Sequence, residues 1–289
     1  MVKTILWSIA MSAVIMSCST PKQNHSLTNK KEVKMETKSK KEKVIELLKS
    51  IETGDAKPVG YINPNKYIQH NLAVGDGLAG FGEVLSQLPK GSAKVEVIRA
   101  FEDGDYVFTH TKYNFFGEKA GFDIFRFENG LIVEHWDNLQ EIAKESVSGR
   151  TQFDGTTEII DKDKTEVNKK LVKNFVNDIL LGNNPNKITD YISTEKYLQH
   201  NPNVADGLEG LGKALEELAK AGMPMKYTEN HMILGEGNFV LSVSEGEFMK
   251  KHVSFYDLFR IENGKIVEHW DTIEEIPEKS NWKNNNGKF

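Results

Sequence analysis

One unit of sequence occurs twice in this chain. Residues 67–71 (YIQHN) return as residues 197–201 (YLQHN), and residues 76–80 (DGLAG) return as residues 206–210 (DGLEG), both 130 positions later. Residues 132–137 (IVEHWD) return unchanged as residues 266–271, now 134 positions later. Blocks that keep their order while a few residues are inserted between them indicate a duplicated domain. The 289 residues have room for two domains of ordinary size.

Each copy is predicted to form helices first and strands afterwards. Asp76 and Asp206 are the expected N-caps of a helix in each copy. The expected helices span residues 44–50, 77–88, 164–181 and 208–221, and the apolar positions predicted to be buried in the third are Val167, Leu171, Phe175 and Ile179. The strands expected in the first copy span residues 94–101, 106–115, 121–127 and 131–138. Helices followed by an antiparallel meander predict an α+β fold in each domain.

The N-terminus has the pattern of an export signal. Lys3 precedes a mostly apolar run at residues 5–16, which is shorter than the roughly 20 residues that a spanning helix needs. The single cysteine, Cys18, follows this run and resembles the lipid-bearing cysteine of bacterial lipoproteins. The expectation is a lipid anchor on Cys18 that holds the protein to a membrane of the bacterial cell envelope, facing the periplasm or the surface. The alternative is an ordinary secretory signal with an incidental cysteine.

These patterns predict six consecutive parts of the chain. Residues 21–43 contain eight lysines, three glutamates and no aromatic residue, which is typical of a flexible tether. The predicted parts are a signal peptide (1–17), a lipidated Cys18 with a disordered tether (18–43), a first domain (44–146), a linker (147–162), a second domain (163–282) and a tail (283–289).

Charge and cysteine content exclude several classes of protein. The whole chain carries −5; because the tether carries +5 and Lys3 adds +1, residues 44–289 carry about −11. An acidic body of this kind is not expected to bind nucleic acid. One cysteine excludes a disulfide within the chain and a zinc site built from several cysteines.

The repeated blocks resemble a known family. YIQHN, DGL and residues 123–137 (DIFRFENGLIVEHWD) together are similar to the SnoaL-like branch of the nuclear transport factor 2-like superfamily, and the resemblance covers nearly all of residues 44–282, twice. It implies two tandem cone domains, in which helices close over a curved antiparallel sheet and leave an apolar pocket. The superfamily includes cyclases, isomerases, dehydratases, epoxide hydrolases and non-catalytic binders, so the resemblance is specific for the fold and not for the function.

The candidate site lies on the last two strands of each copy. Asp123 alternates with Phe125 and Phe127, so the three side chains share one face of their strand. A two-residue turn at residues 129–130 would pair Asp123 with Trp136, and a three-residue loop with a bulge at Gly130 would pair it with His135. We favour the second register. It places Asp123, His135, Asp137, Phe125 and Val133 on the pocket face, and Ile124, Arg126, Glu134 and Trp136 on the other.

The residue types of this site suit proton transfer. A carboxylate beside apolar walls is held closer to the strength of a general acid or base, and histidine can take the complementary role. The resemblance implies an aldol or cyclase step without a cofactor or metal, with Asp137 and His135 as the base and His70 or His110 as the donor. The corresponding candidates in the second copy are Asp257, His269, Asp271 and His200. A metal site built from His70, His110 and His135 does not match a known spacing.

The two copies are expected to differ and to pack together. His110 has valine or serine as its counterpart, which favours the first copy for acid–base chemistry. Trp136 and Trp270 are expected to be packing anchors, and Arg126 and Arg260 to pair with Glu134 and Glu268. The halves are expected to form an internal pseudo-dimer that buries Ile124, Trp136, Leu258 and Trp270.

Three functions remain open at this point. The first is a SnoaL-like lyase or isomerase that acts on a small, partly apolar carbonyl compound. The second is a membrane-anchored protein that binds a small molecule without chemistry. The third is a structural or partner-binding lipoprotein whose pockets are filled by its own side chains.

Overall fold

The computed structural model describes residues 38–88 and 91–289, which lie in one compact unit. The predicted signal peptide, Cys18 and the tether up to residue 37 lie outside the described residues. Among the described residues, no helix has the length and apolar character needed to cross a membrane.

The first repeat is a five-stranded sheet with helices on one face. Its strands lie in the order β1-β5-β4-β3-β2, with β1 parallel to β5 and the other neighbours antiparallel. The elements are α1 (Lys40–Thr53), a 3-10 turn (Lys57–Tyr61), β1 (Ile68–Gln69), α2 (Gly77–Gln87), β2 (Lys94–Asp103), β3 (Tyr106–Asn114), β4 (Glu118–Glu128) and β5 (Leu131–Glu141).

The second repeat has the same arrangement. Its strands lie in the order β6-β10-β9-β8-β7, again with one parallel pair, β6 and β10. The elements are α3 (Thr165–Phe175) continued by a π-helical turn (Val176–Leu180), α4 (Ile188–Tyr191), β6 (Leu198–Gln199), α5 (Gly207–Lys220), β7 (Lys226–Glu236), β8 (Phe239–Phe248), β9 (Lys251–Glu262) and β10 (Lys265–Glu275), with short 3-10 turns at Lys162–Lys164, Pro185–Lys187 and Lys279–Asn281. The prediction of two tandem α+β domains with helices packed on an antiparallel sheet is confirmed.

Two details of the predicted helices are wrong. The first helix begins at Lys40, inside the stretch predicted to be tether, because Ser39 and Glu42 form a reciprocal capping box there. In α3, Val167 was expected on the buried face but is 67% exposed, whereas Val172, Phe175 and Val176 are buried. The buried face of α3 therefore follows Asn168 and Val172 rather than Val167.

Asp76 and Asp206 occupy the N-cap positions of α2 and α5, but neither side chain caps its helix. Each instead accepts a hydrogen bond from a strand: Asp76 Oδ1 from the backbone N–H of Gln69 at 3.1 Å, and Asp206 Oδ1 from that of Gln199 at 2.9 Å. The repeated aspartate therefore ties the start of a helix to the two-residue strand before it, and the prediction of side-chain capping is wrong.

The glycine that ends each DGLxG block permits a close backbone approach. A Cβ on Gly80 would lie 1.8 Å from the carbonyl oxygen of Gly75, and a Cβ on Gly210 would lie 2.3 Å from that of Ala205. Only glycine lets the preceding loop lie against the helix in this way.

The hairpin between β4 and β5 has neither of the two registers considered from the sequence. Residues 129–130 form a two-residue turn, since Glu128 pairs with Leu131. A bulge then follows at Val133 and shifts the pairing by one residue, so that Asp123 lies opposite Asp137. Asp123, Phe125, His135 and Asp137 nevertheless lie on the predicted face. The two-residue turn alone would place Asp123 opposite Trp136, and the one-residue shift at the bulge moves its partner to Asp137, which is on the same face of β5 as His135.

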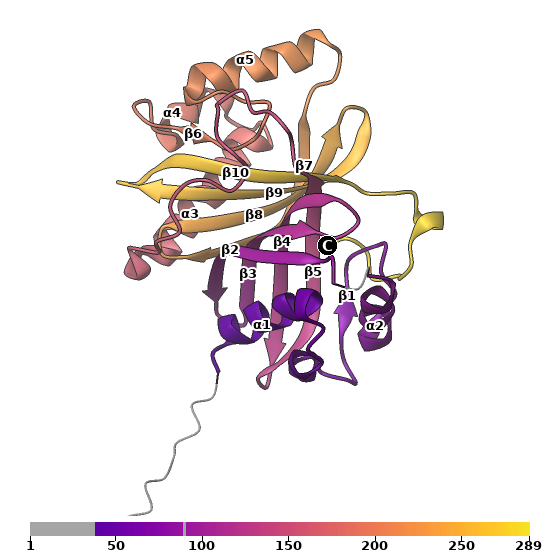
Figure 1. Cartoon of the computed structure of the whole chain (residues 1–289). Helices are drawn as coiled ribbons and strands as arrows, with labels where there is room; N and C mark the ends of the chain where they lie inside the picture. Colours follow the sequence, from indigo (N-terminus) through magenta and orange to yellow (C-terminus); the bar gives the residue numbers. More distant parts are fainter. Residues whose placement is uncertain (1–37, 89–90) are drawn as a thin grey trace, which may run out of the picture. The chain divides into compact units, whose positions relative to one another are not determined.

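The outer faces of the two sheets form one hydrophobic core. Ile124 and Trp136 from the first sheet and Leu258 and Trp270 from the second belong to the same buried cluster, together with Phe101, Phe108, Phe122, Leu234, Phe239, Leu241, Val243 and Tyr256. Figure 1 shows the strands of the second sheet running across those of the first. The helix α1 packs on the opposite, inner face of the first sheet, and α3 does the same in the second.

A polar bridge lies within this contact between the sheets. The Asn138 side chain donates to the carbonyl oxygen of Thr272 at 2.9 Å and also bonds to the Ser254 hydroxyl. These buried groups satisfy one another, so the apolar contact does not leave unpaired polar atoms at this position.

We expect Leu258→Ala to destabilise the whole protein. Leu258 is fully buried in the cluster that both sheets share, so removing its side chain leaves a cavity that neither repeat alone can close. The expected loss in the free energy of unfolding is about 2–5 kcal/mol, measured by urea denaturation. Val167→Ala on the exposed side of α3 serves as the control and should change stability by less than about 0.5 kcal/mol.

Candidate functional site

The inner face of the first sheet and the helices α1 and α2 enclose a cavity of about 260 Å³. Most of its wall is apolar: Leu47, Leu48, Ile51, Phe81, Val84, Phe115, Phe125 and Leu139. The polar residues that line it are Tyr67, Gln69, Asn71, Gln87, Tyr113, Asp123, His135 and Asp137. The predicted site residues Asp123, His135 and Asp137 are therefore brought together in one pocket.

Gln69, His135 and Asp123 form a hydrogen-bonded chain along this pocket. Gln69 Oε1 accepts from the backbone N–H of Asn71 at 2.8 Å, which identifies this side-chain atom as the oxygen. His135 Nδ1 lies 3.1 Å from the same oxygen and must therefore carry a proton. His135 Nε2 lies 3.3 Å from Asp123 Oδ1, so this contact needs a second proton, on the ring or on the carboxyl group. The pair holds one proton more than a neutral histidine beside an ionised aspartate.

Two hydroxyl groups also donate to Asp123. The Tyr113 hydroxyl lies 2.6 Å from Asp123 Oδ2, and the Thr109 hydroxyl lies 3.3 Å from the same oxygen. Donors of this kind favour the charged carboxylate, which places the shared proton on the imidazole of His135. Burial raises the pKa of the Tyr113 phenol well above its ordinary value, and the charge of Asp123 adds to that effect.

Asp137 is the one carboxylate of this pocket with an oxygen that accepts no hydrogen bond from the described residues, although Lys288 Nζ lies 3.8 Å from that oxygen. Its Oδ2 accepts from the Asn71 side chain at 2.7 Å. Its Oδ1 is buried and has no hydrogen-bond partner among the described residues. A buried acceptor without a hydrogen-bond donor costs free energy, and a ligand that supplies a donor would offset this cost.

The second repeat reproduces this arrangement. His269 lies 3.1 Å from Gln199 Oε1 through Nδ1 and 3.0 Å from Asp257 Oδ1 through Nε2. Asp271 Oδ2 accepts from Asn201 at 2.6 Å, and Asp271 Oδ1 again has no partner among the described residues. Burial raises the pKa of Asp271 above its ordinary value.

A tyrosine bonds the strand aspartate in both repeats, but it comes from different strands. Tyr113 lies on β3, opposite Val95 on β2. Tyr227 lies on β7, the counterpart of β2, opposite Gly246 on β8. The Tyr227 hydroxyl nevertheless reaches Asp257 Oδ1 at 3.2 Å. In both repeats a tyrosine hydroxyl therefore donates to the strand aspartate. The tyrosine lies on β3 in the first repeat, opposite the smaller Val95, and on β7 in the second repeat, opposite the smaller Gly246.

A third position accommodates this exchange. A Cβ on Gly121 would lie 2.8 Å from the ring of Tyr113, so repeat one has no room for a side chain there. The corresponding residue in repeat two is Phe255, whose ring stacks on Tyr227 with 4.1 Å between centroids. Large and small residues thus alternate in opposite order across three strands, and the tyrosine–aspartate contact is kept.

Sequence reasoning missed the tyrosines and amides that complete both sites. In YxQxN, Tyr67, Gln69 and Asn71 alternate along an extended segment and therefore face the pocket together. In the second repeat, Gln199 Nε2 donates to the Tyr197 hydroxyl at 3.1 Å, which leaves the phenolic hydrogen of Tyr197 available to a ligand. The period of two in the repeated block was the signal that could have found them.

The same alternation turns His70 and His200 away from the pockets. His70 contacts the carbonyl oxygen of Gly287 at 3.0 Å and Glu134 at 3.0 Å, and its ring stacks on Trp136. His200 makes the corresponding contacts, with Glu268 at 2.9 Å and the ring of Trp270. The prediction that these histidines are pocket donors is wrong, because they lie on the face that carries the two tryptophans.

His110 is also outside the pocket. It lies on the outer face of β3, where its ring stacks on Phe122 and its Nδ1 lies 3.2 Å from the guanidinium of Arg99. Burial lowers the pKa of His110 well below its ordinary value, and the charge of Arg99 adds to this. Val243 is its counterpart in the outer-face cluster. The reason given for favouring the first copy, a pocket role of His110, is therefore wrong.

The predicted arginine–glutamate pairs are present on the same outer faces. Arg126 Nε donates to Glu134 at 2.6 Å, and Arg260 Nε donates to Glu268 at 2.6 Å. Neither arginine lines the cavity of the first repeat.

The donor pattern of the sites does not fit a resident metal ion. Asp123, His135 and Asp137 each offer a ligand atom within 4.8 Å of the others, as do Asp257, His269 and Asp271. However, the nitrogen that would bind a cation is used as an N–H donor to Asp123, and a tyrosine hydroxyl donates to the same carboxylate. A cation would have to displace these hydrogen bonds.

Several solved structures are similar to part of this chain. TsrD from Streptomyces laurentii is 19% identical with a TM-score of 0.30, and the match covers 36% of this chain and 92% of that chain. An NTF2-like protein of unknown function from Cytophaga hutchinsonii is 17% identical with a TM-score of 0.32, covering 37% and 95%. Another from Burkholderia xenovorans is 17% identical with a TM-score of 0.33, covering 40% and 94%. The sequence matches no family model and no curated protein.

The imidazole of His269 is expected to titrate above its ordinary range. Burial by itself lowers its pKa, but the hydrogen bond to Asp257 and the charges of Asp271 and Asp257 outweigh burial and raise the pKa above 6.5. The ion pair therefore contributes stability that is fully present below pH 6.5 and is lost as the pH rises through the folded-state pKa.

Asp257→Asn should lower this pKa, because it removes the charge that faces Nε2. Imidazole NMR signals followed against pH would measure the change, with His269→Gln used to assign the resonance. The half-exposed ring of His252 gives a control signal that should not move. A His269 signal that titrates at the same pH in both proteins would contradict the assignment of the ion pair.

Proposed function

We propose that this protein binds a small, partly apolar carbonyl compound in its cone pocket and moves a proton on it without a cofactor, as SnoaL-like cyclases and isomerases do. The observation that supports this most directly is the buried, unpartnered Oδ1 of Asp137, which is repeated in Asp271. We also propose that the chain is a member of the SnoaL-like branch, on the repeated motifs and the pocket chemistry.

Asp137 is the general base of the proposed reaction. Asn71 holds one of its oxygens, so the other is fixed in position and free to take a proton from the carbon next to a carbonyl group. His135, expected from the sequence to share this role, is occupied at both ring nitrogens. In our proposal it keeps Asp123 charged and anchors Gln69 and does not act on the ligand.

The donor that stabilises the developing enolate oxygen is Tyr67. Its side chain is buried; burial raises the pKa of the phenol, and the charges of Asp137 and Asp123 add to that effect. In our proposal its phenolic hydrogen points to the ligand, as the arrangement in the second repeat allows for Tyr197, whose hydroxyl accepts from Gln199 Nε2 at 3.1 Å. A phenol placed in a dry site can stabilise an oxyanion far better than it can in water.

The dimensions of the cavity favour a small substrate. Its volume of about 260 Å³ lies below the roughly 300–1,000 Å³ typical of pockets for drug-sized ligands. Its apolar wall favours a hydrocarbon body, and the convergence of Tyr67 and Asp137 favours one carbonyl group with an acidic neighbouring C–H.

The protein as a whole is proposed to be a lipid-anchored pseudo-dimer in the bacterial cell envelope. The shared core between the sheets supports the internal pairing of the repeats. The anchor rests on Cys18 and the signal pattern before it. Mass spectrometry of the protein purified from membranes would test the anchor, because an acylated N-terminal Cys18 has a diagnostic mass.

Hydrogen–deuterium exchange at a carbon acid tests the proposed chemistry without knowledge of the natural substrate. Cyclohexanone in D2O, followed by NMR, is expected to exchange its α-hydrogens faster with the protein present. Changing both bases, Asp137→Asn and Asp271→Asn, should reduce the catalysed rate by about 100-fold or more, as expected for the loss of a positioned base. The amide can still accept from Asn71 and Asn201, so the fold should remain.

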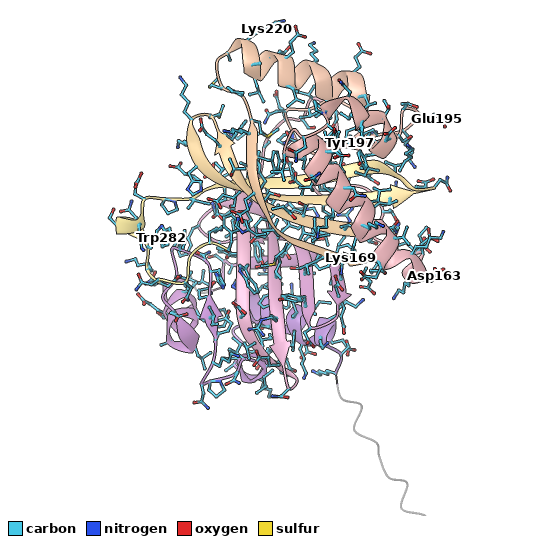
Figure 2. All side chains as sticks on the ribbon, turned by 180° about the vertical axis from the view of Figure 1, so that it is seen from behind. Asp163, Lys169, Glu195, Tyr197, Lys220 and Trp282 are labelled. Atoms are coloured by element: carbon cyan, nitrogen blue, oxygen red, sulfur yellow. The ribbon has the colours of Figure 1, made fainter. Side chains whose placement is uncertain are left out.

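Asp163→Asn, in the exposed 3-10 turn that precedes α3 (Figure 2), is the matched control and should keep the full rate. Native mass spectrometry of the purified protein would search in parallel for a retained ligand. A retained ligand together with exchange that is unaffected by the double substitution would favour binding without chemistry over the proposed enzyme.

A further inference from the structure

The end of the chain returns from the second repeat to the first. Figure 2 shows Trp282 on the short turn that follows the second sheet, and Figure 1 places the C-terminus beside β4 and β5 of the first repeat. The backbone N–H of Lys283 donates to the carbonyl oxygen of Leu72 at 2.8 Å. The Asn284 side chain donates to the carbonyl oxygen of Asn71 at 2.8 Å. Residues 283–289, predicted to be a tail, are therefore a packed part of the fold, and we call them the C-terminal segment.

The C-terminal segment holds the backbone that carries the pocket amides. The Asn286 side chain donates to the carbonyl oxygen of Gln69 at 3.0 Å and to Asp76 Oδ1 at 2.8 Å. His70 contacts the carbonyl oxygen of Gly287 at 3.0 Å. The C-terminal segment follows the second repeat in sequence but holds in place the backbone of Gln69 and Asn71 in the first. These two residues in turn orient His135 and Asp137.

The linker makes the same contacts with the second repeat. Val147 donates to the carbonyl oxygen of Pro202 at 2.9 Å, and the Ser148 hydroxyl donates to that of Gln199 at 2.9 Å. His200 contacts the carbonyl oxygen of Thr151 at 2.8 Å, as His70 contacts that of Gly287. The next residue along the chain is Gln152 after Thr151 in the linker and Lys288 after Gly287 in the C-terminal segment.

Lys288 places a buried positive charge beside the proposed base of the first pocket. The residue is only 6% exposed. Its ammonium donates to the carbonyl oxygen of Asp137 at 2.8 Å, lies 3.8 Å from Asp137 Oδ1 and bonds to Glu274 of β10. In the second repeat the corresponding residues are two uncharged amides, Gln152 and Gln140.

We propose that Lys288 is a positioning residue of the first pocket, where its ammonium pairs with the Asp137 carboxylate and holds it in place, and that the corresponding site of the second repeat lacks this support. The two sites are then chemically different, because among the described residues only the first has a buried ammonium beside its base. The role of Lys288 in catalysis rests on the proposed function, whereas its electrostatic effect on Asp137 does not.

The charges around the two bases support this difference. Asp137 shares its surroundings with Asp123 and Glu274, so three carboxylates are balanced by the imidazolium of His135 and by Lys288; the other ionisable neighbours are Tyr67, Tyr113 and Tyr256. Without Lys288, like charges would oppose the ionisation of Asp137 and Glu274 together. The ionisable neighbours of Asp271 are Asp257, His269, Tyr197 and Tyr227, with His200 acting through space from the other face, and no lysine or arginine of the described residues pairs with its carboxylate.

The first test needs no ligand. Carboxyl 13C NMR of the full protein, with Asp137→Asn used to assign the signal, follows ionisation of this side chain against pH. In Lys288→Met the Asp137 signal is expected to titrate about one pH unit or more higher than in the unchanged protein, because an opposite charge within 4–6 Å typically has an effect of this size. Lys288→Arg should restore the original midpoint, and Lys283→Met, an exposed lysine of the same segment, should leave it unchanged.

A second variant separates charge from packing. Adding Glu274→Gln to Lys288→Met removes the carboxylate that lost its partner, and the midpoint is expected to return part of the way. If Lys288→Met weakens the fold, this double variant still tests the electrostatic role, because it removes both charges of the buried Lys288–Glu274 pair. An Asp137 signal with the same midpoint in all of these proteins would overturn the proposal.

The second test uses exchange of cyclohexanone in D2O and isolates one pocket at a time. In an Asp271→Asn background, Lys288→Met should move the pH profile of exchange to higher pH by a similar amount, with Lys288→Arg restoring it. In an Asp137→Asn background, Lys288→Met should leave the profile of the second pocket unchanged. A shifted NMR midpoint without any exchange by the unchanged protein would refute the proposed function and retain the role of Lys288. Equal shifts of both pockets would refute the assignment of Lys288 to the first.

Discussion

The burial of each sheet's outer face against the other repeat is the interaction on which this structure depends. A strand presents alternate side chains to opposite faces, so covering one face with a second sheet leaves the other free for helices and a pocket. Trp136 and Trp270 lie on the covered side, and Asp123 and Asp257 lie on the pocket side. The alternation of side chains along each strand therefore determines both which residues hold the two repeats together and which residues face the pocket side.

The pocket chemistry is preserved more strictly than the positions that supply it. Tyr113 and Tyr227 stand on different strands, yet both bond the same aspartate, and Gly121 and Phe255 adjust the neighbouring volume in opposite directions. Packing alone does not require a tyrosine hydroxyl at that aspartate, since a buried apolar ring would fill the same space. The retained contact argues that the charge state of the aspartate–histidine pair matters in both halves.

The segments that follow each sheet make the two halves interdependent. The linker bonds to the backbone of Gln199 in the second repeat and the C-terminal segment bonds to that of Gln69 in the first, and they make corresponding bonds to His200 and His70. These histidines are thus part of the contact between repeats, which explains why they recur in the repeated block without facing a ligand. Because the two segments differ in sequence, the first repeat has Lys288 beside its site and the second repeat has Gln152 at the corresponding position.

The sequence by itself determined the duplication, the order of helices and strands, and the face shared by Asp123, His135 and Asp137, because repeats and alternation are local patterns. It did not determine the hairpin register, since the bulge at Val133 leaves no mark in residue type. It also did not show that His110 belongs to the outer core or that Lys288 reaches Asp137, because both facts depend on segments far apart in the chain. Only the tertiary structure brings those segments together, and it does so through the packing of one sheet on the other.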